Sequence, residues 1–264
     1  SEGRQVTASP LAGRRVVVTR AERQSGGLRE RLERQGAEVL LLPTIQIVPP
    51  HSYELLDAAL RLPQQFHWLV VTSTNAVRVI GERLTALGLR VESLAQLHCA
   101  VVGPSTAEAL RSLGLAVEVV PKRYIGEALA AALAHRVRGQ RVLLVRAAIG
   151  RDAVPDALKS AGAAVTVVDA YRTVVPADAV ERARAIFGAE PLPDAVVFTS
   201  GSTVTHLLDV LREAGLELPQ QVACVSIGPV TSAALREAEF AVAVEAETAS
   251  LDALVDACVR LFAR

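Results

Sequence analysis

The sequence predicts an α/β protein made of two doubly wound, flavodoxin-like parallel-sheet domains. Short runs of β-branched residues recur along the chain, and each is followed by a polar loop and then by apolar residues at helical spacing. Continuous apolar strands that alternate with amphipathic helices are typical of parallel sheets covered by helices on both faces. A chain of 264 residues, 51% of them hydrophobic, is long enough to form two cores of ordinary size.

The second half of the chain repeats the landmarks of the first half in the same order. The repeated pairs are RVVVTR at 15–20 with RVLLVR at 141–146, GAEV at 36–39 with GAAV at 162–165, VVTSTN at 70–75 with VFTSGS at 197–202, and VVGPSTA at 101–107 with SIGPVTS at 226–232. The first two pairs are 126 positions apart, and the others are 127 and 125 apart. Such a constant offset indicates a repeated architecture.

Each landmark has the form of a strand that opens into a polar loop and then into a helix ended by glycine, the residue most often found just after a helix. The four predicted strands are 16–19, 69–71, 100–102 and 142–145. The loops that follow them are 21–27, 72–75, 103–106 and 146–151, and the glycines that end the helices are Gly36, Gly88, Gly114 and Gly162. The second copies, whose strands contain Val196 and Val225, follow the same pattern.

Two ribbons rich in β-branched residues, each closed by a proline, are predicted to connect the two lobes. They are VTVVDAYRTVVP at 165–176 and VLLLPTIQIVP at 39–49. The first is too polar after Val168 for an ordinary buried strand. A connecting ribbon would place Tyr171 and Arg172 at a cleft.

The charge balance argues against nucleic-acid and membrane partners. The chain has 28 basic and 28 acidic residues, so no global field attracts a nucleic acid or an acidic membrane surface, and any anion site must be local. No apolar run approaches the roughly 18 residues of a membrane span. The balanced surface predicts a monomer.

The cysteines and histidines predict neither a disulfide framework nor a metal site. Cys99, Cys224 and Cys258 are widely spaced, which is typical of small buried residues in a reducing cytoplasm. The five histidines have no neighbours at metal-ligand spacing. We therefore expect a cytoplasmic protein without a bound metal.

The candidate binding residues lie at the carboxyl ends of the predicted strands, where doubly wound folds bind ligands. Hydroxyl and amide groups there either cap helices or donate to carboxylates and phosphates at a positive helix end. Arginines at equivalent strand ends either bind a carboxylate or pair with a neighbouring acid, Glu22 or Asp152. The candidates are Arg20, Thr72, Ser73, Asn75, Gly103, Ser105, Thr106, Arg146, Thr199, Ser200, Gly201, Ser202, Gly228 and Thr231. Together they favour a large polyanionic ligand held between two lobes.

Several other classes of site are disfavoured or left open. No strand is followed by a phosphate-binding P-loop or by Gly-x-Gly-x-x-Gly, which argues against a site for ATP or a dinucleotide. Gly-x-Ser-x-Gly is also absent, which argues against covalent hydrolysis. The segment 122–124, Lys-Arg-Tyr, is expected to be solvated surface. A cytosolic two-lobed small-molecule binding protein and a flavodoxin-like FMN protein remain alternatives.

The ordered motifs of the chain resemble those of the uroporphyrinogen-III synthase family. They are VTR at 18–20, TSTNAV at 72–77, DAYRT at 169–173, FTS at 198–200 and IGPVT at 227–231, and the resemblance runs from Leu11 to about Phe262. It implies lobes that exchange segments. One lobe would contain residues 1–41 and 177–264 and the other 51–168, joined by linker strands at 42–50 and 169–176.

The resemblance also implies a reaction. Hydroxymethylbilane, a linear tetrapyrrole, would lose its hydroxyl group as water, invert its last pyrrole ring through a spiro intermediate and close to uroporphyrinogen III, in tetrapyrrole and haem biosynthesis and without a cofactor. Uncatalysed closure gives the isomer that is not inverted, so the enzyme would contribute orientation. We also expect a transient handover of the substrate from hydroxymethylbilane synthase.

The family motifs assign roles to three residues. Tyr171 matches the tyrosine that assists the leaving hydroxyl group as an acid, and a phenol can donate a proton at neutral pH. Thr231 and Ser200 match residues that bind the acetate or propionate arms. Val230 replaces a second hydroxyl residue that is common beside Thr231.

Overall fold

The computed structural model describes residues 9–20, 26–148 and 152–263, and the chain divides into two compact units. Unit 1 contains Ser1–Gln46 and Val174–Arg264, and unit 2 contains Ile47–Thr173. Unit 1 is therefore assembled from two segments far apart in the sequence, whereas unit 2 is continuous. Each unit holds a five-stranded sheet, and the predicted fold class of two parallel-sheet α/β domains is confirmed.

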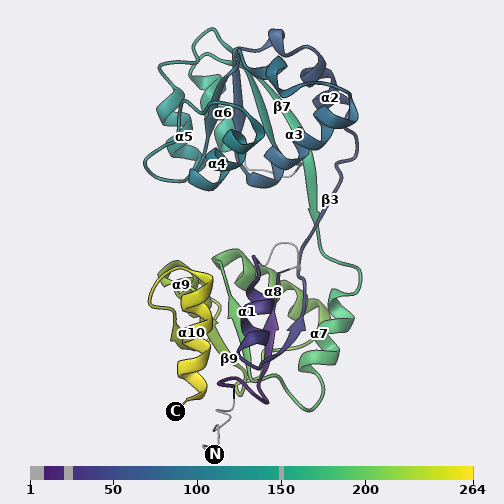
Figure 1. Cartoon of the computed structure of the whole chain (residues 1–264), viewed down its shortest axis with the longest axis vertical. Coiled ribbons are helices and arrows are strands. Elements are labelled where there is room, and N and C mark those ends of the chain that lie inside the picture. The colour runs from purple at the N-terminus through teal and green to yellow at the C-terminus, as the bar shows by residue number, and fades with distance from the viewer. Residues whose placement is uncertain (1–8, 21–25, 149–151, 264) are drawn as a thin grey trace, which may run out of the picture. The chain divides into compact units, whose positions relative to one another are not determined.

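The sheet of unit 1 has the strand order β10-β9-β8-β1-β2, with every neighbouring pair parallel. Its strands are β1 (Arg15–Val18), β2 (Glu38–Leu41), β8 (Ala195–Phe198), β9 (Ala223–Ser226) and β10 (Val242–Glu245). Its helices are α1 (Leu28–Arg34), α7 (Ala179–Phe187), α8 (Gly201–Ala214), α9 (Pro229–Glu237) and α10 (Leu251–Phe262). One buried cluster joins the sheet to α7, α8 and α9, and another joins it to α1 and α10, so helices cover both faces (Figure 1).

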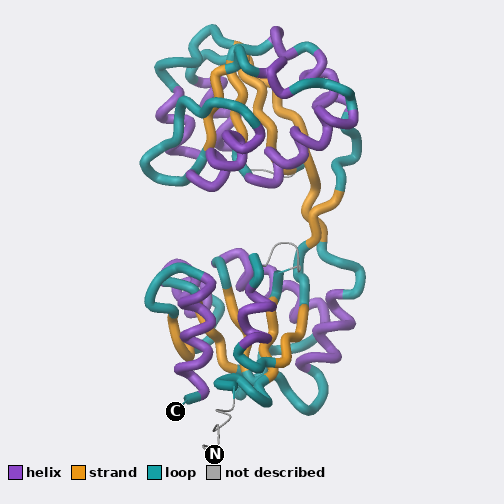
Figure 2. Tube along the Cα trace, viewed as in Figure 1, coloured by secondary structure: helices purple, strands orange, loops and turns teal. Residues whose placement is uncertain are grey.

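The sheet of unit 2 has the order β3-β7-β6-β4-β5, in which β7, β6, β4 and β5 run parallel. Its strands are β3 (Gln46–Val48), β4 (Trp68–Val71), β5 (His98–Val101), β6 (Arg141–Ala147) and β7 (Ala164–Val174). Its helices are α2 (Glu54–Arg61), α3 (Thr74–Ala86), α4 (Pro104–Leu113), α5 (Gly126–Leu133) and α6 (Ala153–Ser160), with short 3₁₀ turns at Pro63–Gln65 and Val91–Leu94. Figure 2 shows the strands of this unit enclosed by helices on both sides.

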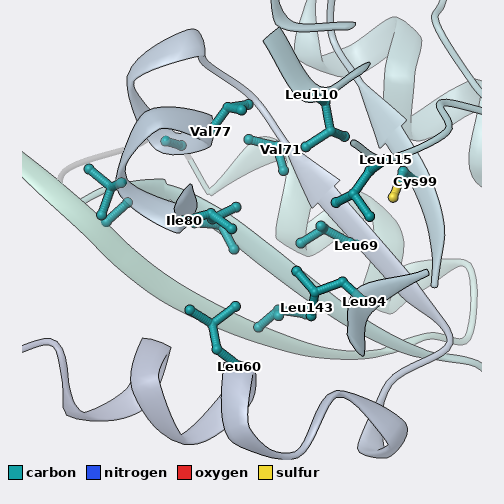
Figure 3. Packing of buried hydrophobic residues seen from close by; sticks show 14 of the residues in the cluster. Leu60, Leu69, Val71, Val77, Ile80, Leu94, Cys99, Leu110, Leu115 and Leu143 are labelled. Carbon is teal, nitrogen blue, oxygen red and sulfur yellow. The ribbon is translucent and has the colours of Figure 1, made fainter. Parts of the chain in front are cut away.

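Both faces of β4 are buried, which explains why its sequence is apolar throughout. Leu69 and Val71 pack against α2, α3 and α4, and Figure 3 shows them beside Val77 and Ile80 of α3. Trp68 and Val70 point to the opposite face and pack against α5 and α6. A strand buried on both faces has no polar alternation, since successive side chains point to opposite sides of the sheet.

Strand β7 continues beyond the end of the neighbouring strand. It pairs with β6 from Ala164 to Tyr171, and the register shifts between Arg146 and Ala147. The predicted linker begins at Asp169, whereas β7 stays in the sheet as far as Tyr171. The final residues of β7 extend beyond that pairing, and β3 is its other neighbour in the sheet.

The chain order of the strands defines a switch point in each sheet. In unit 1 the connection from β1 leads to β2 on one side, while β8, β9 and β10 follow on the other side. In unit 2 the connection from β6 leads to β7 on one side, while β4 leads to β5 on the other. Ligands of doubly wound sheets bind at such switch points, outside the carboxyl ends of the strands. The two predicted arginines follow β1 and end β6, so both lie at a switch point.

A charged cluster lies at the opposite edge of unit 2, where β4 and β5 begin. The Glu118 carboxylate lies 2.5 Å from Nδ1 of His98 and 2.9 Å from Nη2 of Arg136. The Arg136 guanidinium lies over the Trp68 ring, 4.8 Å from its centroid. The hydrogen bond to His98, supported by Arg136, lowers the pKa of Glu118 although partial burial opposes this.

The lowered pKa of Glu118 makes the stability of unit 2 depend on pH. The ionised Glu118 carboxylate stabilises the folded state fully above the ordinary carboxyl pKa of about 4.3. This stabilisation is lost as the pH falls through the lower pKa of the folded state. We expect Glu118→Gln to lower the melting temperature near pH 7, and the difference from wild type to shrink toward about pH 3. Glu92→Gln, which changes an exposed pair with Arg90, is the control and should have little effect at either pH. A difference for Glu118→Gln that stays constant with pH would contradict the assignment.

Candidate active site

A pocket of about 340 Å³ lies at the switch point of unit 2. It is lined by Thr72, Ser73, Val102, Tyr124, Ile125, Gly126, Leu144, Arg146, Ala147, Val154 and Tyr171. Four of these residues, Thr72, Ser73, Arg146 and Tyr171, are candidates predicted from the sequence. The parallel strands bring them together because β7, β6 and β4 are neighbours and all end at the same edge.

Tyr171 combines a buried ring with a hydroxyl group at the pocket. Only 8% of the residue is exposed, and its ring belongs to the core beneath α3. The backbone is held by the sheet, since the carbonyl of Tyr171 accepts a hydrogen bond of 2.8 Å from the amide of Ala148. Its hydroxyl oxygen lies 2.9 Å from Oγ of Ser73. The core thus fixes the ring, and Ser73 fixes the direction of the hydroxyl group.

Ser73 links this hydroxyl group to the start of a helix. It is the N-cap of α3, and its Oγ accepts a hydrogen bond of 3.2 Å from the amide of Ala76. The first amides of a helix give its amino end a partial positive charge. The capping interpretation and the site interpretation of Ser73 are therefore compatible, because one oxygen atom contacts both the helix and Tyr171.

Arg146 contributes a cation to the same pocket. Its Nη2 lies 3.1 Å from Oδ1 of Asp152, whose side chain is largely exposed. The ion pair predicted as an alternative is therefore formed. Exposed partners of this kind add little stability and exchange readily with a ligand carboxylate.

The other candidates of unit 2 do not line this pocket. Asn75 is half-buried in the first turn of α3, and Gly103 is the buried N-cap of α4. Ser105 is exposed, whereas Thr106 is buried within α4. These residues follow β4 and β5, but they are not among the residues that line the pocket with Arg146 and Tyr171.

In unit 1, Arg20 and the turn after β8 occupy the corresponding switch point. Arg20 is half-buried, and burial lowers the pKa of its guanidinium group. Arg20 forms no ion pair with another residue in the described part of the chain. Glu22, its predicted alternative partner, lies outside the described residues, and so does Arg151 of the predicted loop 146–151. Oγ1 of Thr199 is buried without a hydrogen-bond partner among the described residues.

The remaining hydroxyl groups of that turn organise helix α8. Ser200 is its N-cap and forms a capping box with Thr203. Oγ of Ser200 also lies 2.9 Å from Oγ of Ser202, which is exposed, and Gly201 begins the helix. Ser200 therefore has the same structural role in unit 1 that Ser73 has in unit 2.

A buried hydrogen-bond network holds the Gly228 turn. Ser226 Oγ donates to the Gly228 carbonyl at 2.9 Å, and Ser232 Oγ donates to Glu245 Oε2 at 2.5 Å. The structure buries Thr231 in α9, with 3% of the residue exposed, while 80% of Val230 is exposed. At this turn the apolar residue, not the predicted threonine, faces solvent.

Sequence reasoning missed the apolar part of the unit 2 pocket. Tyr124 and Ile125 are exposed and immediately precede α5, and Val154 lies in the first turn of α6. The sequence signal for this part of the pocket was Tyr124, an aromatic residue just before a helix. The basic residues beside it, Lys122 and Arg123, favoured an assignment to solvated surface instead.

The match to known proteins extends over most of the chain. The family model for uroporphyrinogen-III synthase HemD matches residues 27–256. The uroporphyrinogen-III synthase of Synechococcus elongatus is 34% identical over 253 residues, which cover 93% of this chain and 94% of that protein. The chain belongs to the uroporphyrinogen-III synthase family. Enzymes of this family cyclise hydroxymethylbilane in tetrapyrrole biosynthesis.

Two further comparisons agree with the family. The uroporphyrinogen-III synthase of Chlorobaculum parvum is 26% identical over 225 residues, which cover 84% of this chain and 88% of that protein. A crystal structure of a mutant uroporphyrinogen III synthase from Thermus thermophilus has a TM-score of 0.69 at 24% identity, covering 95% of this chain and 99% of that one, and it supports the fold. The synthase family is favoured over the small-molecule binding protein and the FMN protein.

The described residues contain neither a helix that could span a membrane nor a cluster of metal ligands. None of their helices combines the length and apolar character that a membrane span needs. Their histidine, cysteine and acidic side chains form no group of three or more that could hold a metal ion.

A substitution at Ser73 separates its capping role from its contact with Tyr171. Removing an N-cap hydroxyl costs about 1 kcal/mol of stability. Ser250 caps α10 in the same way, accepting a hydrogen bond of 3.1 Å from the amide of Ala253. We expect Ser73→Ala and Ser250→Ala to be destabilised alike, but only Ser73→Ala to lose turnover of hydroxymethylbilane. Equal turnover in both variants would show that the contact with Tyr171 has no role in the reaction.

Proposed function

We propose that this chain cyclises hydroxymethylbilane to uroporphyrinogen III, with inversion of the last pyrrole ring and loss of water. The observation that carries the assignment of the site is the 2.9 Å contact between the Tyr171 hydroxyl group and Ser73, in a pocket that Arg146 also lines. A proton donor, a fixed hydrogen-bond partner and a cation thus meet at the switch point of one sheet.

In this proposal Tyr171 acts as the general acid. As the bond between the terminal methylene carbon and its hydroxyl oxygen breaks, the phenol donates its proton and water leaves. The electron-rich pyrrole supplies the electrons and becomes a cationic, conjugated ring. Ring inversion and closure later release one proton from the substrate, and this proton restores the phenol. Ser73 donates a hydrogen bond to the transient phenolate, which stabilises it at the positive end of α3.

Most of the remaining candidates are proposed to bind the acetate and propionate arms. In unit 2, Arg146 and the Thr72 hydroxyl group line the same pocket as Tyr171 and would bind the arms nearest the reacting carbon. The other proposed carboxylate contacts are Asn75, Gly103 and Ser105 in unit 2, and Arg20, Thr199, Ser200, Gly201, Ser202 and Gly228 in unit 1. Thr106 and Thr231 are buried in α4 and α9 and are not proposed as contacts. The desolvated Arg20 and the buried Oγ1 of Thr199 support a polar ligand in unit 1.

The proposed setting is a cytoplasmic monomer that receives its substrate by transient handover from hydroxymethylbilane synthase. The three cysteines are buried and unpaired, which suits a reducing compartment. Burial raises the pKa of Cys99 and Cys224 to about 11 and that of Cys258 to about 12, so they persist as thiols. Size-exclusion chromatography with light scattering tests the monomer.

The deciding experiment compares the products formed from freshly prepared hydroxymethylbilane with and without the protein. The porphyrinogens are oxidised and their isomers separated by chromatography. We expect the type III isomer with the protein and the type I isomer without it, and the same result after treatment with a chelator. Only the type I isomer in both reactions would refute the proposed function, and loss of activity on chelation would refute its independence of metal.

A further inference from the structure

The pocket of unit 2 has an apolar lining that the proposed acid chemistry does not use. Tyr124 and Ile125 line it together with Val102 and Val154. Tyr124 is a large side chain, yet 62% of it is exposed. Exposed aromatic side chains that border a pocket are common where proteins contact a ligand.

Tyr124 packs beside the pocket at a point where two glycines allow the chain segments to lie close together. A Cβ atom on Gly103 would lie 3.5 Å from Cβ and 3.7 Å from Cγ of Tyr124, so the tyrosine packs directly on the backbone before α4. A Cβ atom on Gly126 would lie 2.6 Å from Cγ2 of Val154, which lets the start of α5 approach α6 closely. The segment before α5 therefore packs against the start of α4 on one side and against α6 on the other, which places Tyr124 at the border of the pocket.

The size of the pocket limits what can lie against this ring. Its volume of about 340 Å³ is at the lower end of the range for ligand sites, roughly 300 to 1,000 Å³, and suits one substituted ring better than a four-ring chain. An aromatic face attracts a flat ring by offset stacking and attracts a cation through its π electrons. The reacting pyrrole has both properties, since it is flat and becomes positively charged when water leaves.

We infer that Tyr124 stacks on the terminal pyrrole ring of the linear tetrapyrrole, beside Tyr171, and that this contact controls which isomer forms. This inference rests on the proposed function. The ring must turn over before the macrocycle closes, and closure without the turn gives the type I isomer. A stacked aromatic side chain stabilises the cationic ring and keeps it from closing early.

The test uses Tyr124→Ala, Tyr124→Phe and a control, Leu55→Ala, which removes another exposed apolar side chain from unit 2 at α2. Initial rates with hydroxymethylbilane and the ratio of type III to type I product are measured for each. We expect Tyr124→Ala to lower kcat/KM by about 3- to 10-fold, the range for an aromatic pair, and to raise the type I fraction. Tyr124→Phe should restore both properties, and Leu55→Ala should match wild type.

The outcomes separate this inference from the proposed function. If wild type forms the type III isomer and Tyr124→Ala does so with unchanged rate and ratio, the stacking role is refuted and the proposed function stands. If Tyr124→Phe is as impaired as Tyr124→Ala, the aromatic face is not the active feature, and the inference is also refuted. If wild type forms no type III isomer, both fail. Melting temperatures close to wild type, expected for an exposed side chain, exclude loss of fold as the cause.

Discussion

Replacing Tyr171 with phenylalanine should lower kcat for the type III product by about 100-fold while KM changes little, since general acids typically contribute 10² to 10⁴ in rate. The substitution removes the oxygen that lies 2.9 Å from Ser73 and leaves the buried ring in the core. Only the proton donated in the transition state is lost, so the effect falls on kcat. The measurement is a steady-state assay with freshly prepared hydroxymethylbilane and separation of the product isomers.

The matched control for Tyr171→Phe is Tyr53→Phe. Tyr53 also lies in unit 2, where its ring packs under the guanidinium group of Arg83, away from the residues of the pocket. We expect Tyr53→Phe to have the turnover of wild type. The acid role would be refuted by near-normal kcat in Tyr171→Phe, and a large rise in KM with normal kcat would instead make Tyr171 a binding residue.

Leu69→Ala should destabilise unit 2 by about 3 kcal/mol, because it creates a cavity in a close-packed core. Leu69 is in the middle of β4 with 1% of its surface exposed, and it packs among α2, α3 and α4 (Figure 3). Partial collapse of the surrounding side chains would reduce the cost, but β4 is held by strands on both sides.

The single tryptophan of the chain makes this loss measurable in unit 2. Trp68 precedes Leu69 and is 2% exposed, so its fluorescence during urea denaturation follows the unfolding of that unit. Leu55→Ala, in which the same change is made at a side chain that is 67% exposed, should shift the transition by less than about 0.5 kcal/mol. Similar transitions for the two variants would contradict the packing described for β4.

Much of the fold could be predicted because the chain repeats one local pattern. Apolar strands, polar loops and helices ended by glycine are encoded by neighbouring residues. Ser73 and Ser200 illustrate this, since helix capping was one of the two roles considered for these turns and each residue caps its helix. The placement of the candidates at strand ends also followed, because parallel strands present all their carboxyl ends at one edge. The repeat and the ordered motifs were sufficient to indicate the family.

The composition of the pocket depended on contacts between distant residues. Ser73 and Tyr171 are 98 positions apart, and their contact requires β6 to lie between β4 and β7. Tyr124 joins the pocket because the chain before α5 packs beside the start of α4, where Tyr124 contacts Gly103. Periodicity describes which residues face a core, but it carries no information on which loop ends meet across a sheet, because strand order is set by packing of the whole unit.

Packing also explains why two of the predicted candidates are buried. Thr106 and Thr231 follow their strands at equivalent positions, and both are buried in the first turns of α4 and α9. A polar residue near a strand end can face either the ligand or the helix interface, and the rotation of the helix decides between them. The sequence thus established the fold class, the family and the edge of each sheet where the candidate residues lie, whereas the packing of helices against the sheets selected the residues that share the pocket with Tyr171.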